Sequence, residues 1–213
     1  MISYFKEIGL KRILLMLLGV IAIGIGVACL RFAGFGTDPF SCMNIGVSSH
    51  LPMSYGTYQM IVNVILFIPV ILLCPRSFGI GAFVNMLGVG YIVDFCVLAC
   101  GWMKITVETV ETLWGIRMFL VFIGILILCF GVALYMNCDL GVAPYDMIAQ
   151  IAQERTNGRL KFKWVRIALD VTCMLIGIFT GGTFGIATVF VALFTGPVVS
   201  WFRKLIIAEK WLD

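Results

Sequence analysis

The chain has 213 residues, of which 62% are hydrophobic and 12% charged, against about 45–50% and 25% in an ordinary soluble domain. A soluble fold of this length cannot bury so much apolar surface, and the mean hydropathy of +1.08 indicates the same. The composition therefore predicts an all-α polytopic membrane protein with a single membrane domain over residues 1–213, and it excludes soluble enzymes and nucleic-acid-binding proteins despite the net charge of +4.

Six stretches are apolar enough, and nearly long enough, to cross a bilayer, which takes about 20 residues. In chain order they are Ile13–Leu30, Tyr58–Cys74, Phe78–Cys100, Met118–Met136, Lys163–Thr180 and Phe184–Ile207. Two shorter apolar stretches, Pro39–Ser49 and Pro144–Gln153, would each extend only about 15–17 Å as helices. Both begin with proline, which suits the first helical position. We therefore expect two half-helices that enter the membrane and turn back against protein.

Basic residues predict the orientation, because they are enriched in cytoplasmic loops. They gather near both chain ends and in the loop between Glu154 and Trp164. Six spans place all three regions in the cytoplasm, with Arg76 inside and the nearly neutral loop Gly101–Leu113 outside. If both half-helices crossed fully, eight spans would move Arg76 and that loop to the opposite sides.

The two halves of the chain align with each other. An offset of 105 residues matches Gly36 with Gly141 and Pro39 with Pro144, and an offset of 107 matches Asn63 with Asp170. We therefore predict two tandem repeats, over about residues 12–100 and 117–207, each with three transmembrane helices and one proline-started half-helix. Three crossings per repeat would give the repeats inverted topology, as in many secondary transporters. Eight spans would make the repeats parallel instead.

Two short motifs carry a resemblance to a known family. The runs GTDPF at Gly36–Phe40 and GVAPYD at Gly141–Asp146, together with the glycine-paired first span of each half, resemble the YczE/YitT-like bacterial integral membrane proteins. The resemblance covers nearly the whole chain and is greater to the short YczE-type members. It implies a multi-pass protein of the bacterial cytoplasmic membrane and supplies no substrate, reaction or site residue.

Ionisable side chains at membrane depth are candidates for function because their burial is costly. The candidates for binding a substrate or ion are polar residues in or beside the half-helices and in the interrupted spans. They are Asp38, Ser41, Asn63, Asp94, Asp146 and Asp170.

Each acidic candidate also has a structural explanation. Asp38 and Asp146 lie at half-helix amino ends, where a carboxylate can cap the helix. Asp170 lies one helical turn after Arg166, so the two can form an ion pair. Asp94 has no basic neighbour on its own helix and needs a partner from another helix, water or a proton. Pro39, Pro144 and Arg31 have expected structural roles, with Arg31 reaching the membrane interface.

The leading hypothesis is a small-solute transporter with a midplane site between the repeats. Two half-helix amino ends would favour an anionic or carboxylate-bearing solute, and Asp170 or Asp94 would bind the coupling H⁺ or Na⁺. The alternative is a non-transporting membrane scaffold that docks a partner on its basic cytoplasmic surfaces. We expect no enzyme activity, cofactor, metal or nucleic-acid partner, and we expect the lipid bilayer around the bundle. A homodimer would enlarge a six-span bundle, although no particular residue argues for one.

Overall fold

Helices form nearly all of the part of the chain that the computed structural model describes, residues 10–73, 79–102 and 113–208. They are α2 (Leu10–Ala33), α3 (Pro39–Ser48), α4 (Tyr55–Leu73), α5 (Ile80–Trp102), α7 (Trp114–Asn137), α8 (Pro144–Arg155), α9 (Phe162–Phe179) and α10 (Ile186–Ala208). Within these ranges there is no strand. The all-helical prediction is therefore confirmed for the described residues.

Five of these helices are long and apolar enough to cross a membrane: α2, α4, α5, α7 and the stretch Ile186–Ile207 of α10. The sixth predicted span corresponds to α9, which has 18 residues and contains three charged residues, Lys163, Arg166 and Asp170. The two short helices have 10 and 12 residues, close to the predicted half-helices. The multi-pass membrane character predicted from the sequence is thus supported.

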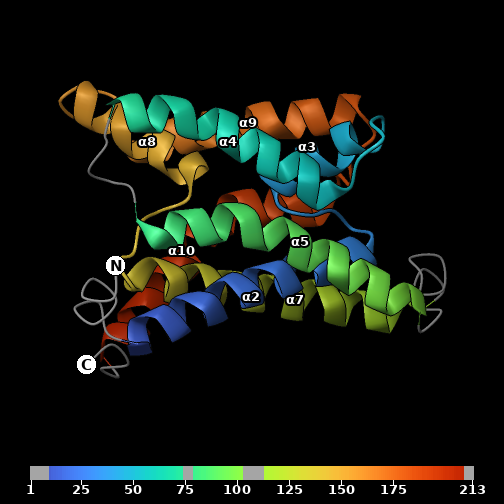
Figure 1. The fold of residues 1–213 in the computed structure, drawn as a ribbon. Coiled ribbons are helices and arrows are strands. Elements are labelled where there is room, and N and C mark those ends of the chain that lie inside the picture. Colours follow the sequence, from blue (N-terminus) through green and yellow to red (C-terminus); the bar gives the residue numbers. More distant parts are fainter. Residues whose placement is uncertain (1–9, 74–78, 103–112, 209–213) are drawn as a thin grey trace.

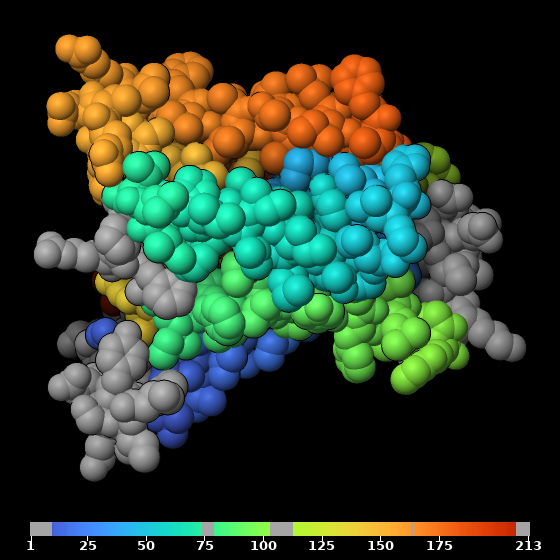
Figure 2. All heavy atoms as spheres, turned by 45° about the horizontal axis from the view of Figure 1, so that its top comes forward, coloured from blue at the N-terminus to red at the C-terminus, as the bar shows by residue number. Residues whose placement is uncertain are grey.

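The helices form two layers (Figure 1). One layer contains α2, α5, α7 and α10, and the other contains α3, α4, α8 and α9. In the second layer α3 packs on α9 and α8 packs on α4, so each short helix contacts a long helix from the other half of the chain. Figure 2 shows α4 and α9 running side by side over this face. Helix α2 begins and α10 ends on the same side of the molecule in Figure 1.

Glycines allow α2 and α7 to pack very closely. A Cβ atom built on Gly19 would lie 2.9 Å from the carbonyl oxygen of Gly131, and one on Gly26 would lie 2.9 Å from that of Gly124. Any side chain at these positions would push the two backbones apart. Small residues allow this type of contact between helices in lipid, where apolar burial drives association little.

The chain turns sharply before each short helix. Gly36 has φ +108° and Gly141 has φ +101°, values that favour glycine. The carbonyl just before each glycine accepts a backbone hydrogen bond from the beginning of a long helix in the other half. Phe35 accepts from Ala187 at 3.0 Å, and Leu140 accepts from Gly81 at 2.6 Å. Each short helix is therefore held in place by the opposite half of the chain.

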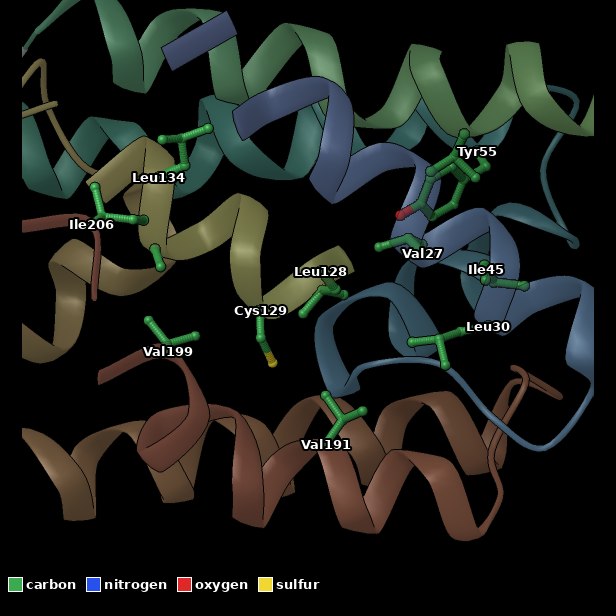
Figure 3. Close-up of a cluster of buried hydrophobic side chains, with 12 residues drawn as sticks. Val27, Leu30, Ile45, Tyr55, Leu128, Cys129, Leu134, Val191, Val199 and Ile206 are labelled. Carbon is green, nitrogen blue, oxygen red and sulfur yellow. The ribbon is translucent and has the colours of Figure 1, made fainter. Parts of the chain in front are cut away.

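The largest apolar cluster lies between the layers and at the α7–α10 contact (Figure 3). Val27 and Leu30 of α2 lie near Tyr55 of α4, while Cys129 of α7 faces Val191 of α10. This cluster packs α4 against the first layer. It therefore helps to position the polar residues described in the next subsection.

The repeat boundaries, the inverted topology and the number of crossings remain predictions. Arg76 and residues 103–112 of the loop Gly101–Leu113 lie outside the described residues, so the predicted sides of the membrane for this arginine and this loop are not tested.

Candidate functional site

The amino ends of the two short helices meet inside the molecule. Pro39 and Pro144 occupy the first turn of α3 and α8, as predicted, and each is followed by an aromatic residue. The rings of Phe40 and Tyr145 are 4.7 Å apart between centroids, with 35° between their planes. Two segments about a hundred residues apart in sequence are therefore brought to one place, which we call the helix-end junction.

Three residues of α8 and α9 surround an arginine at this junction. The Tyr145 hydroxyl donates a 2.7 Å hydrogen bond to one carboxylate oxygen of Asp170. The Nε atom of Arg166 donates to the other oxygen at 3.4 Å, and its guanidinium forms an ion pair with Asp146. The guanidinium carbon lies 4.6 Å from the centroid of the Tyr145 ring, in a cation–π contact. The expected pair of Arg166 with Asp170 is therefore present, and Asp146 joins it rather than capping its own helix.

On the α3 side, Asp38 caps the short helix as expected. One carboxylate oxygen accepts a 3.0 Å hydrogen bond from the backbone N–H of Ser41. The other oxygen, Oδ2, is buried and has no hydrogen-bond partner among the described residues. The Tyr55 hydroxyl donates to the Ser41 side chain at 3.0 Å, and the Arg31 guanidinium lies 5.9 Å from the Tyr55 ring centroid. Asp38 therefore has one carboxylate oxygen available to a ligand.

Two buried amide side chains, one on α3 and one on α4, have unpartnered polar atoms among the described residues. Asn44 of α3 has no exposed surface, and neither its nitrogen nor its oxygen has a partner among the described residues. Gln59 of α4 is 5% exposed, and its side-chain oxygen is also unpartnered there. Most buried polar groups in proteins are hydrogen-bonded, and leaving one unpaired costs about 1–3 kcal/mol. These amide groups are therefore further buried polar atoms of α3 and α4 that could accept or donate another hydrogen bond.

Asp94 has a structural partner rather than a place at the junction. Its side chain, on α5, accepts a 2.8 Å hydrogen bond from the backbone N–H of Gly56 in the first turn of α4. The carboxylate thus caps a neighbouring helix, which is one of the outcomes expected for a residue without a basic neighbour. Asn63 is buried on α4 and takes part in none of the hydrogen bonds just described.

The charges at the junction do not balance. Asp146 and Asp170 share the single guanidinium of Arg166. Two carboxylates therefore share one arginine, while a second arginine, Arg31, lies against Tyr55 on the α3 side. No group of three His, Cys, Asp or Glu side chains in the described ranges is arranged to hold a metal ion. The helix-end junction is therefore acidic, and the rings of Phe40 and Tyr145 lie beside its carboxylates.

Several junction residues were absent from the sequence-based candidates. Tyr145 and Phe40 align with each other at an offset of 105 and directly follow the two prolines, which was a signal of a shared position. Gln59 aligns with Arg166 at an offset of 107, which was a similar signal. Tyr55 and Asn44 gave none, because their contacts and burial depend on how α3 packs against its neighbours.

Comparisons with known proteins agree with the resemblance seen in the motifs. The chain is 28% identical over 198 residues to an uncharacterized protein of Haemophilus influenzae, a match that covers 92% of this chain and 85% of the relative. It is 24% identical over 183 residues to the uncharacterized membrane protein YczE of Bacillus subtilis, with coverage of 85% and 80%. The uncharacterized protein YyaS of the same organism is 21% identical over 194 residues, with coverage of 89% and 90%.

No solved structure matches the chain. The model of a family described as a family of unknown function, DUF6198, matches residues 10–204. Because that match spans nearly the whole chain, the protein belongs to the DUF6198 family and is similar to the YczE membrane protein.

Proposed function

We propose that the protein is a small-solute transporter whose binding site is the helix-end junction. The observation that carries the proposal is the meeting of two short-helix amino ends, at Phe40 and Tyr145, beside the buried carboxylates of Asp38 and Asp170. Transporters commonly bind solutes and ions near the bilayer midplane, where discontinuous helices converge between repeated halves.

The contacts between the halves support the predicted repeat. The hydrogen bond from Ala187 to Phe35 and the one from Gly81 to Leu140 join positions that correspond at offsets of 105 and 106. In addition, α3 packs on α9 and α8 packs on α4, again a corresponding pair. Two halves related in this way can exchange conformations, which gives alternating access to a site between them.

The charge balance changes the expected solute. Helix amino ends alone favour anions, which was the reason to expect an anionic or carboxylate-bearing solute. Here Asp38 already caps α3, and Asp146 occupies the first turn of α8. Because Asp146 and Asp170 share the one guanidinium of Arg166, a cation beside them lowers the electrostatic energy and an anion raises it. We therefore propose a positively charged solute, or a neutral one bound together with H⁺ or Na⁺.

The coupling ion would bind at Asp38 or Asp170 rather than at Asp94. Asp38 has an unpartnered carboxylate oxygen, and Asp170 is a buried carboxylate that shares its arginine with Asp146. Asp94 is occupied by its hydrogen bond to Gly56. The proposal also includes a bacterial cytoplasmic-membrane location, cytoplasmic termini, a homodimer and no enzyme activity.

Transport assays on purified protein in liposomes would test this proposal. A panel of amines, amino acids and carboxylates would be added outside, and solute uptake and internal pH would be recorded. We expect uptake of at least one compound, at least tenfold slower with Asp38→Asn or Asp170→Asn. Asp139→Asn is the matched control, because Asp139 is an exposed aspartate with positive φ, which asparagine also adopts.

The outcomes separate the two functional hypotheses. Uptake that Asp139→Asn preserves and both junction variants abolish would support a transporter. Absence of uptake across the panel, together with stoichiometric copurification of another protein, would instead favour the membrane scaffold. Uptake that is equal in all variants would show that the junction is not the solute site.

A further inference from the structure

The connection between α8 and α9 is strongly basic. Residues 154–164 contain four basic residues and one acidic residue. Arg155 ends α8, and Arg159 and Lys161 follow it, with all three side chains exposed. Neither Arg159 nor Lys161 has an ion-pair partner within residues 10–73, 79–102 and 113–208. Their positive charges are therefore available to a partner outside the chain.

Hydrogen bonds hold this connection in one shape. The backbone N–H of Leu160 donates to the side-chain oxygen of Thr156 at 3.1 Å, which closes the turn that contains Arg159. Arg155 donates at 3.1 Å to the carbonyl oxygen of Leu73, the last residue of α4. The connection is thus attached to α8 and to the end of α4, so its basic side chains project from defined backbone positions.

The connection lies at the ends of long helices rather than along their sides. In Figure 1 it is found on the side of the molecule where α2 begins and α10 ends. Helices that cross a bilayer end near its surfaces, so the connection would lie at the level of the lipid headgroups. Arg12, in the first turn of α2, and Lys204, near the end of α10, are also exposed. These two residues have the same charge but belong to other helices.

Exposed apolar side chains accompany the basic ones. Leu160, which lies between Arg159 and Lys161 in the sequence, is 50% exposed. Trp164, in the first turn of α9, is 64% exposed. Tryptophan is enriched at membrane–water interfaces, where its ring lies at the level of the headgroups. The surface therefore combines positive charge with apolar groups, as a molecule with an anionic head and an apolar body requires.

We propose that the α8–α9 connection binds the headgroup of an anionic phospholipid. Arg159 and Lys161 would donate hydrogen bonds to its phosphate, since guanidinium and ammonium groups both bind phosphate oxygens through charge-assisted hydrogen bonds. Leu160 and Trp164 would contact the glycerol and the upper part of the acyl chains, which a free phosphate lacks. This inference does not depend on the proposed transport, because a scaffold protein with the same connection would bind the same lipid.

Lipid binding would be measured by native mass spectrometry on the full-length protein in detergent. Phosphatidylglycerol and phosphatidylcholine with identical acyl chains are the probes, and wild-type protein should bind the first at least tenfold more tightly. A basic residue near an anionic lipid contributes about fivefold, so the double variant Arg159→Gln/Lys161→Gln should bind phosphatidylglycerol at least tenfold more weakly. Its binding of phosphatidylcholine should stay within twofold of wild type, which also shows that the variant is folded.

Arg12→Gln/Lys204→Gln is the matched control, because it removes two exposed charges outside the connection. This variant should keep its affinity for phosphatidylglycerol within twofold of wild type. Equal losses in the two double variants would show that the lipid responds to the overall charge of the protein, and would overturn the inference. Equal binding of the two lipids to wild-type protein would overturn it as well.

Competition by a soluble headgroup tests whether the ligand is a lipid. Glycerol 3-phosphate in hundredfold excess should leave the bound phosphatidylglycerol in place, because it has no acyl chain to contact Leu160 and Trp164. Displacement of the lipid would show that the connection binds a free phosphate ester equally well, and would refute the assignment to a lipid.

Discussion

The α2–α7 contact gives the clearest quantitative prediction. In Gly131→Ala the new Cβ atom would lie 2.7 Å from the carbonyl oxygen of Gly19 and 2.8 Å from the backbone nitrogen of Ile23. Ordinary van der Waals contact begins at 3.4 Å, so the backbones of α2 and α7 would have to move apart by about 0.7 Å to accommodate the new atom. Neither atom belongs to a flexible side chain, so the helices themselves must move.

The expected cost is that of overpacking a tightly packed interior, about 1–3 kcal/mol. A glycine-to-alanine change also raises helix propensity by up to about 1 kcal/mol, so a matched control is needed. Gly115→Ala supplies it, because nothing lies within 4 Å of a Cβ atom at that position in the same helix. We expect Gly131→Ala to unfold with a free energy about 1–3 kcal/mol below that of Gly115→Ala.

Unfolding free energies would be measured by steric trapping in bicelles, where both variants can be compared with wild-type protein. Equal stability of the two variants would refute the close backbone contact, and with it the arrangement of the α2, α5, α7 and α10 layer. A loss in Gly131→Ala alone would support it.

Two further predictions concern buried charges and use the same unfolding measurement. Asp94→Ala should lower the free energy of unfolding by about 1–3 kcal/mol, because the Gly56 N–H loses its acceptor. Asp94→Asn keeps a side-chain oxygen that can accept the same hydrogen bond, so it should cost less than half as much. Equal losses of stability in the two variants would contradict the capping role. Arg166→Gln should cost about 1–3 kcal/mol, less than for a fully buried pair because the Arg166 side chain is 31% exposed, and adding Asp146→Asn should recover part of that loss. Additive effects of Arg166→Gln and Asp146→Asn would mean that their ion pair contributes nothing.

The helices themselves were largely predictable from sequence. Hydropathy placed a span at Ile13–Leu30 and the structure has α2 at Leu10–Ala33, while the prolines predicted both short helices to begin at Pro39 and Pro144, as observed. These features are local, since they depend on apolar runs and on the fixed φ angle of proline.

The site was only partly predictable, because its contacts depend on packing between helices. The pair of Arg166 with Asp170 follows from their spacing on one helix, and it was expected. The hydrogen bond from Tyr145 to Asp170 and the one from Gly56 to Asp94 join different helices. No spacing along one helix encodes such contacts, so only the three-dimensional arrangement shows which carboxylate has a partner.

The exchange of backbone hydrogen bonds at Phe35 and Leu140 has a consequence for assembly. Each half supplies a carbonyl to the other and receives an N–H from it, through Ala187 and Gly81. Residues 10–102 synthesised alone would leave the Phe35 carbonyl and the Gly81 N–H without these partners, within an apolar surrounding where unpaired backbone groups are costly. During biosynthesis the first half would therefore reach its final form only after the second half has been inserted. Two separately expressed halves should in turn each be degraded alone and recovered together when coexpressed.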